Sequence, residues 1–146
     1  MHFLFKDQLV IPTIYFYARA PASLSLSTGQ TVVYTTVEAN EGQGYDPSSG
    51  RFTVSVPGLY SFAVQFCTEN QKTAYLEIVN QYKTLQKSSF EDQNVNGNYL
   101  SVSMQVFTKA DVSDQIWVKS SDFTTSAFQN DDVFRRNSFT GALVHV

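Results

Sequence analysis

The stretch GYDPSSGRFTVSVPGLYSF, residues 44–62, combines two turn signals with one unbroken alternation of side-chain types. The dipeptides Ser49-Gly50 and Pro57-Gly58 favour turns. Continued to residue 66, the apolar positions are Phe52, Val54, Val56, Tyr60, Phe62, Val64 and Phe66. A period of two indicates β-strands with one buried face. The stretch therefore predicts two consecutive strands whose aromatic side chains point inward, with a Pro-Gly corner between them.

The same alternation recurs along most of the chain. The segments expected to be strands are 14–20, 31–39, 51–56, 59–68, 73–79, 82–88, 99–107, 115–120 and 139–146. Turn-forming residues separate them, as at Thr28-Gly29 and Asn80-Gln81. Eight to ten short strands at regular spacing predict an all-β sandwich, jelly roll or barrel in a single domain.

Composition and charge exclude several classes of protein. The chain has 146 residues, of which 42% are hydrophobic and 14% aromatic, and its net charge is −3. A nucleic-acid-binding domain usually carries a basic stripe and a basic overall charge, so the negative net charge argues against this class. No apolar run reaches the roughly 18 residues that a membrane-spanning helix needs. We therefore expect a globular domain that neither binds nucleic acid nor inserts into a membrane.

Residues suited to catalysis are scarce. The only histidines are His2, near the N-terminus, and His145, the penultimate residue, so a nucleophile–His–carboxylate arrangement has few ways to form. The sequence has no Gly-x-Ser-x-Gly elbow, no His-Glu-x-x-His helix and no glycine-rich phosphate loop. The single cysteine, Cys67, is either a buried free thiol or a site of intermolecular disulfide formation or other reactivity. We expect a non-enzymatic protein without a cofactor.

Four blocks of sequence occur in the order found in one domain family. The blocks are YFYARA (15–20), YDPSSGRFTVSVPGLYSFAV (45–64), SDQIWVK (113–119) and NSFTGALV (137–144). Together they resemble the globular head domain of the complement C1q family, with Ser113 where the family usually has Gly. The resemblance covers residues 14–146 and leaves 1–13 as an N-terminal extension.

The resemblance implies a ten-stranded jelly-roll sandwich, akin to the tumour necrosis factor fold, that assembles as a homotrimer. It places the apolar residues of 52–64 in the core of two adjacent strands. It also implies a secreted protein whose signal peptide is not among these residues. The 12 Phe, 8 Tyr and 1 Trp fit a trimer, because three-fold packing buries aromatic side chains in an apolar interface. The alternative is that they all pack in the core of one chain.

Several members of this family bind calcium at the trimer axis through acidic residues, which supply the oxygen ligands that calcium prefers. In this sequence the corresponding positions fall near Gln71 and Asn80, whose amides are weaker calcium ligands than carboxylates. This departure argues against calcium at the axis. The remaining metal candidates are Glu69, Glu77, Asp131 and Asp132.

The candidates for ligand binding are charged or aromatic residues, most of them in predicted loops. Tyr82 and Lys83 fall in the strand expected over 82–88, and core placement is the alternative for Tyr82. Arg135 and Arg136 precede the last strand, and an arginine fork suits carboxylate, sulfate and phosphate groups. Repeated in a trimer, such a pair can bind repetitive anionic surfaces by avidity. The alternative is that the arginines pair with the neighbouring aspartates. The main candidates are Arg135, Arg136, Asp131, Asp132, Lys83 and Tyr82, and Lys87 and Lys72 are further basic candidates.

The resemblance leaves functions of different classes open. The first is innate-immune pattern recognition, in which a lectin-like head binds microbial polysaccharide, lipopolysaccharide or other repetitive anionic ligands, as in single-head invertebrate members of the family. The second is a signalling or adhesion ligand for a protein receptor, as in the cerebellin and adiponectin relatives. A purely structural trimerisation head is the third. Of these we expect pattern recognition.

Overall fold

The structure, a computed structural model, describes residues 11–93, 99–122, 128 and 132–146, without the side chain of Asp132. Its elements are β1 (Tyr15–Pro21), β2 (Tyr34–Glu41), β3 (Tyr45–Asp46), β4 (Arg51–Thr53), β5 (Gly58–Cys67), β6 (Thr73–Asn80), β7 (Thr84–Glu91), β8 (Ser101–Ala110), β9 (Gln115–Ser120), the 3-10 helix η1 (Asp132–Phe134) and β10 (Ser138–His145). This described part of the chain contains no helix long and apolar enough to cross a membrane.

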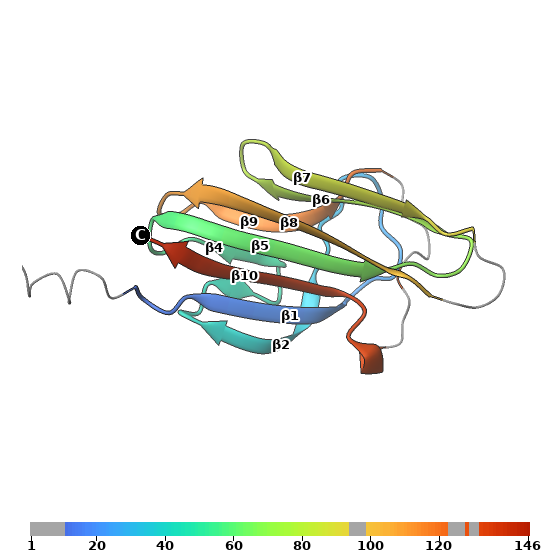
Figure 1. Cartoon of the computed structure of the whole chain (residues 1–146), viewed down its shortest axis with the longest axis horizontal. Coiled ribbons are helices and arrows are strands. Elements are labelled where there is room, and N and C mark those ends of the chain that lie inside the picture. Colours follow the sequence, from blue (N-terminus) through green and yellow to red (C-terminus); the bar gives the residue numbers. More distant parts are fainter. Residues whose placement is uncertain (1–10, 94–98, 123–127, 129–131) are drawn as a thin grey trace, which may run out of the picture.

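The strands form two five-stranded antiparallel sheets that pack face to face (Figure 1). We call β2-β1-β10-β5-β8 the front sheet and β3-β4-β9-β6-β7 the rear sheet. Strand neighbours are often distant in sequence, since β10, the last strand, lies between β1 and β5. The arrangement confirms the predicted all-β, ten-stranded jelly-roll sandwich.

Residues 51–66, the alternating part of the stretch quoted above, form β4, the Pro-Gly corner and most of β5. Their alternation of buried and exposed side chains is confirmed. Phe52, Tyr60 and Phe62 are at most 1% exposed. The expectation that the two strands are adjacent is wrong, because β4 pairs with β3 and β9 in the rear sheet while β5 pairs with β10 and β8 in the front sheet. The aromatic rings therefore meet across the core. The Phe52 centroid lies 5.8 Å from that of Tyr60 and 5.7 Å from that of Phe62.

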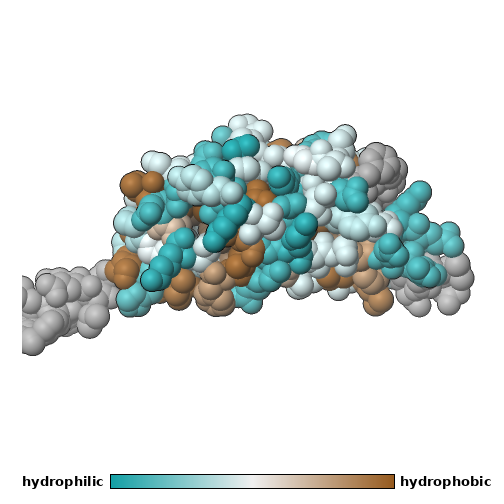
Figure 2. All heavy atoms as spheres, turned by 90° about the horizontal axis from the view of Figure 1, so that it is seen from above, coloured by the Kyte–Doolittle hydropathy of each residue, from teal (hydrophilic) through white to brown (hydrophobic). Residues whose placement is uncertain are grey.

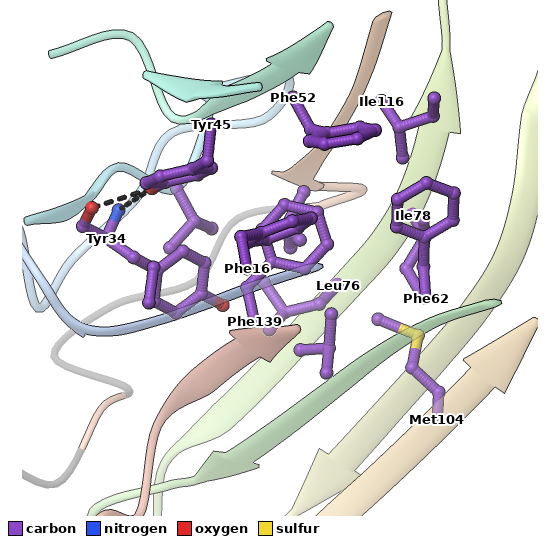
Figure 3. Close-up of a cluster of buried hydrophobic side chains, with 14 of the residues drawn as sticks. Phe16, Tyr34, Tyr45, Phe52, Phe62, Leu76, Ile78, Met104, Ile116 and Phe139 are labelled. Atoms are coloured by element: carbon purple, nitrogen blue, oxygen red, sulfur yellow. Dashed lines mark hydrogen bonds between the residues drawn. The ribbon is translucent and has the colours of Figure 1, made fainter. Parts of the chain in front are cut away.

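Aromatic rings in stacked, tilted and edge-on contacts fill the space between the sheets (Figure 3). The ring centroid of Phe16, in β1, lies 5.0 Å from that of Phe52 and 4.8 Å from that of Phe139. The Tyr45 hydroxyl donates to the backbone O of Tyr34 at 2.6 Å and accepts from its backbone N at 3.1 Å, so the polar end of this buried ring is satisfied. The core of one chain thus takes many of the aromatic residues that the structure describes, while others, such as Phe107 and Tyr82, are exposed.

Candidate functional site

The outer face of the front sheet has small side chains with aromatic residues on either side. In one row across the sheet, Tyr15 pairs with Ala142 and Ala142 pairs with Ser61. Ser61 then pairs with Phe107 in the edge strand β8. Phe107 is 57% exposed and Tyr15 is 39% exposed. Exposed apolar surface on one sheet face is typical of a protein interaction site.

The outer face of the rear sheet is charged. Arg51, in β4, places its guanidinium carbon 3.8 Å from the ring centroid of Trp117 in β9. Nη1 of Arg51 also donates to Oε1 of Gln115 at 3.2 Å. The two contacts hold the guanidinium in one orientation, and a cation–π contact of this kind contributes about 0.5–1 kcal/mol at a partly exposed site. The Arg51 fork is therefore fixed before any ligand arrives.

Two lysines flank a carboxylate in the middle of this face. Glu77, in β6, pairs in register with Lys119 of β9 on one side and Lys87 of β7 on the other. Glu77 is buried and accepts a hydrogen bond from the Thr84 hydroxyl at 2.5 Å. Lys87 is exposed and Lys119 is half-buried. The row therefore carries one more positive charge than negative.

The hairpin between β6 and β7 brings Tyr82 and Lys83 next to these cations. Oδ1 of Asn80 accepts hydrogen bonds from the backbone N of Tyr82 and of Lys83, both at 2.8 Å, and such an Asx turn holds the tip in one shape. Tyr82 is 80% exposed. A hollow of about 250 Å³ adjoins the tip, and its lining includes Tyr82, Lys83, Trp117 and Lys119.

Sequence reasoning thus identified Tyr82 and Lys83 but missed Arg51, Trp117 and Lys119. A signal was present, because each of the three occupies the phase opposite to the buried residues of its strand. That phase predicts that the three side chains are on the outer face of a sheet, but it does not predict that they lie near one another. The pairing of β4 with β9 and of β9 with β6 brings the residues together, and no local pattern reveals this strand order.

The structure separates the two arginines that the sequence places side by side. Arg135 is exposed, whereas Arg136 is half-buried. The guanidinium carbon of Arg136 lies 5.3 Å from the ring centroid of Tyr99 and 4.8 Å from that of Phe134. Its Nη1 lies 3.8 Å from Sγ of Cys67. The expectation of an exposed pair therefore holds for Arg135 only, and Arg136 belongs to the packing at the end of β5.

Cys67, the last residue of β5, is a buried free thiol. Its backbone N donates to Oδ1 of Asn137 at 3.1 Å. Burial raises the pKa of the Cys67 thiol, and the nearby Arg136 guanidinium offsets part of the rise. A protonated, inaccessible thiol is a poor nucleophile. The structure supports the buried free thiol over a reactive or disulfide-forming cysteine.

We expect Cys67 to resist alkylation in the folded protein. At pH 8, iodoacetamide should modify it at least about 100-fold more slowly than in the urea-unfolded chain, because burial shields the sulfur and lowers its thiolate fraction. Arg136→Ala should raise the rate in the folded protein by uncovering the sulfur, and Arg135→Ala should leave it unchanged. Mass spectrometry over time measures the three rates. Equal rates in the folded and unfolded wild-type chain would contradict this account of the thiol.

The metal candidates do not form one cluster in the described structure. Glu69 lies in the turn before β6, while Glu77 is the fifth residue of β6, about 13 Å along the strand from its start. Asp131 lies outside the described residues, and Asp132 begins η1 with its side chain outside them. Where the structure describes the chain, no group of three or more His, Cys, Asp or Glu side chains is placed to hold a metal ion.

Comparisons with known proteins identify relatives of this domain. The family model described as the C1q domain matches residues 15–144. Mouse complement C1q tumor necrosis factor-related protein 7 is 24% identical over 116 residues, which make up 79% of this chain and 38% of that protein. The chain thus spans about two fifths of the length of the curated relative it matches.

Solved structures share the sandwich. The globular domain of zebrafish complement 1qA has a TM-score of 0.64 and 20% identity, over 91% of this chain and 98% of that one. Murine APRIL at pH 5.0 has a TM-score of 0.69 and 13% identity, over 90% of this chain and 99% of that one. Eiger TNF from S. frugiperda has a TM-score of 0.67 and 10% identity, over 92% of this chain and 94% of that one. These structures show the fold, and the family match confirms the resemblance: the chain belongs to the C1q domain family, whose domains are non-enzymatic binding modules.

Proposed function

We propose that the chain assembles as a homotrimer through the outer face of the front sheet and acts as a secreted module that binds repetitive anionic microbial surfaces. The observation that carries the proposal is the composition of that face. It exposes Phe107 and Tyr15 on either side of small residues such as Ala142. Figure 2 shows a different side of the molecule, where hydrophilic side chains predominate and hydrophobic ones form small separate patches.

An aromatic edge and a small-residue centre are complementary to each other. Phe107 of one protomer can cover the flat surface around Ala63 and Ala142 of the next. Because the two patches differ, the contact is heterologous, and a heterologous contact with suitable rotation closes into a ring. The family resemblance supports a ring of three. Closure removes the exposed aromatic rings from water, which stabilises the assembly.

Assembly through the front sheet turns the rear sheets outward. The cations of the rear face, among them Lys83 and Lys87, are then repeated three times on one particle. Individually weak contacts with a repetitive surface add up through avidity. Lipopolysaccharide and acidic glycans offer such repeated negative charges, which favours them as ligands.

Binding to immobilised lipopolysaccharide tests this function. We expect the wild-type protein to bind the lipopolysaccharide surface and not to bind a surface coated with mannan, which is neutral. Binding should weaken as salt rises from about 0.05 M to about 0.5 M, because salt screens exposed charges. Surface plasmon resonance measures both responses. Equal binding to the two surfaces, or none to lipopolysaccharide at low salt, would overturn the proposed ligand class.

One residue favours a second function, recognition of a protein receptor. Tyr82 is 80% exposed at the tip of a hairpin that Asn80 holds in shape, and exposed tyrosines often anchor protein interfaces. Loss of cell binding after trypsin treatment of the cells, combined with no binding to lipopolysaccharide, would favour the receptor over the anionic surface.

A further inference from the structure

We propose that the outer face of the rear sheet binds an extended acidic glycan chain along a strip formed by Arg51, Lys119, Lys87 and Lys83. This inference rests on the proposed function and assigns it a site. It differs from the candidate that the sequence favoured, since Arg136 is engaged in packing against Tyr99, Phe134 and Cys67.

The strip is positively charged on a chain whose net charge is −3. None of its four cations forms an ion pair with a carboxylate of the described residues, in contrast to Arg19, which pairs with Glu38. The carboxylate among them, Glu77, is buried and hydrogen-bonded to Thr84. The strip therefore presents a net positive potential to an approaching anion.

Arg51 is the pre-oriented anchor of the strip. Its guanidinium lies against Trp117 at 3.8 Å and donates to Gln115 at 3.2 Å. A guanidinium in a fixed plane can bind a carboxylate or sulfate through two parallel hydrogen bonds. Little side-chain entropy is lost on binding because the neighbours already hold the group in place.

The strip suits a chain of sugars better than a single one. The hollow beside Trp117 lies at Val79 of β6, and a second hollow of about 450 Å³ has Tyr75 of β6 in its lining. The two positions are four residues, or about 13 Å, apart along one strand. Lys87 also lines the second hollow, together with Ser89 and other hydroxyl-bearing residues. Aromatic rings and hydroxyls at both ends, with lysines between, match an oligosaccharide that carries occasional acidic groups.

A glycan fits this face better than a nucleic acid does. Asp122 lines the second hollow and Glu91 accepts from the Tyr75 hydroxyl at 3.4 Å. These carboxylates repel a backbone with a phosphate at every residue, whereas a glycan can place neutral sugars there.

Fluorescence anisotropy with a labelled hexasaccharide in which galacturonic acid alternates with neutral rhamnose tests the site. We expect the wild-type protein to bind it and to ignore neutral maltohexaose. Lys83→Gln/Lys87→Gln should weaken binding at least about fivefold and Arg51→Gln/Lys119→Gln at least about tenfold, since each variant removes two charge-assisted contacts. Lys83 and Lys87 are exposed, so the first variant is expected to fold normally. Lys72→Gln and Arg135→Gln, which remove exposed cations outside the strip, should bind as wild type does.

Four results would overturn this inference. The first is unchanged binding in both strip variants. The second is an equal loss in the Lys72→Gln or Arg135→Gln control. The third is tighter binding of a labelled oligothymidylate than of this hexasaccharide, which would indicate a nucleic-acid site. The fourth is binding of the wild type to lipopolysaccharide but not to the hexasaccharide, and this result would leave the proposed function standing. Binding to neither ligand would overturn both the strip and the proposed function.

Discussion

Gly141→Ala is expected to lower the free energy of unfolding by about 3 kcal/mol, at the upper end of what overpacking of a core usually does. A Cβ atom at Gly141, in the middle of β10, would lie 2.4 Å from Cε1 of Phe16 and 2.6 Å from Cδ1 of Phe62. Both rings are fully buried. Phe16 is further confined by Phe52 and Phe139, so neither ring can move aside without displacing others. Urea denaturation followed by fluorescence measures the change.

Gly29→Ala is the matched control for this substitution. Gly29 has a φ of +83°, but a Cβ atom added there would meet no other atom within 4 Å. The substitution should therefore lower the free energy of unfolding only by the cost of placing alanine in the left-handed region, about 1–2 kcal/mol. Phe16→Leu in the Gly141→Ala background should recover part of the loss, because the two sites are in contact and therefore non-additive. A Gly141→Ala protein no less stable than Gly29→Ala would show that the core is more loosely packed than described.

Phe107→Glu is expected to convert the trimer into a monomer. Phe107 is 57% exposed in one chain and lies opposite Ser61 at the edge of the front sheet, where we place the protomer contact. A carboxylate there would have to be buried against apolar surface in each of three interfaces, and an unpaired buried charge is strongly unfavourable. The residue is on the surface of the monomer, so the monomer itself should keep its fold. Light scattering coupled to gel filtration measures the mass.

Tyr82→Glu is the control, because it also replaces an exposed aromatic ring by a carboxylate. Tyr82 is 80% exposed but lies at the tip of the β6–β7 hairpin, which belongs to the rear sheet and not to the front sheet. This variant should remain trimeric. If Phe107→Glu is still trimeric, the front-sheet edge is not the interface; if Tyr82→Glu also becomes monomeric, any added charge disrupts assembly and the assignment of the face fails.

The core of the fold could be predicted from local sequence because alternation is a local property. Phe62 and Val64 in β5 and Phe52 in β4 are buried as their phase predicts. The hairpin at Asn80-Gln81 also follows from its residues, since the Asn80 side chain forms the turn. What local patterns do not show is which sheet a strand joins. The short strand β4 and the long strand β5 share one phase yet lie in opposite sheets.

The candidate site was harder to predict, because its residues come from different strands. Arg51 contacts Trp117 only because β4 and β9 are neighbours. Arg136 looked like an exposed loop residue, since nothing in the sequence shows that Cys67 and Tyr99 lie beside it. Tyr82 and Lys83 were named for their chemistry but were placed in a strand over 82–88, whereas the structure puts them before β7, at the exposed tip of the hairpin. Residues whose role depends on long-range contacts are the ones that sequence reasoning missed.

The molar mass of the wild-type protein in solution tests the central claim most directly. At micromolar concentration, light scattering should give three times the 16.4 kDa of the chain. The apolar outer face of the front sheet would then be covered, and three outward rear faces would be available for multivalent binding. A mass equal to that of a single chain would contradict the proposed assembly, and with it the avidity on which the recognition of repetitive surfaces depends.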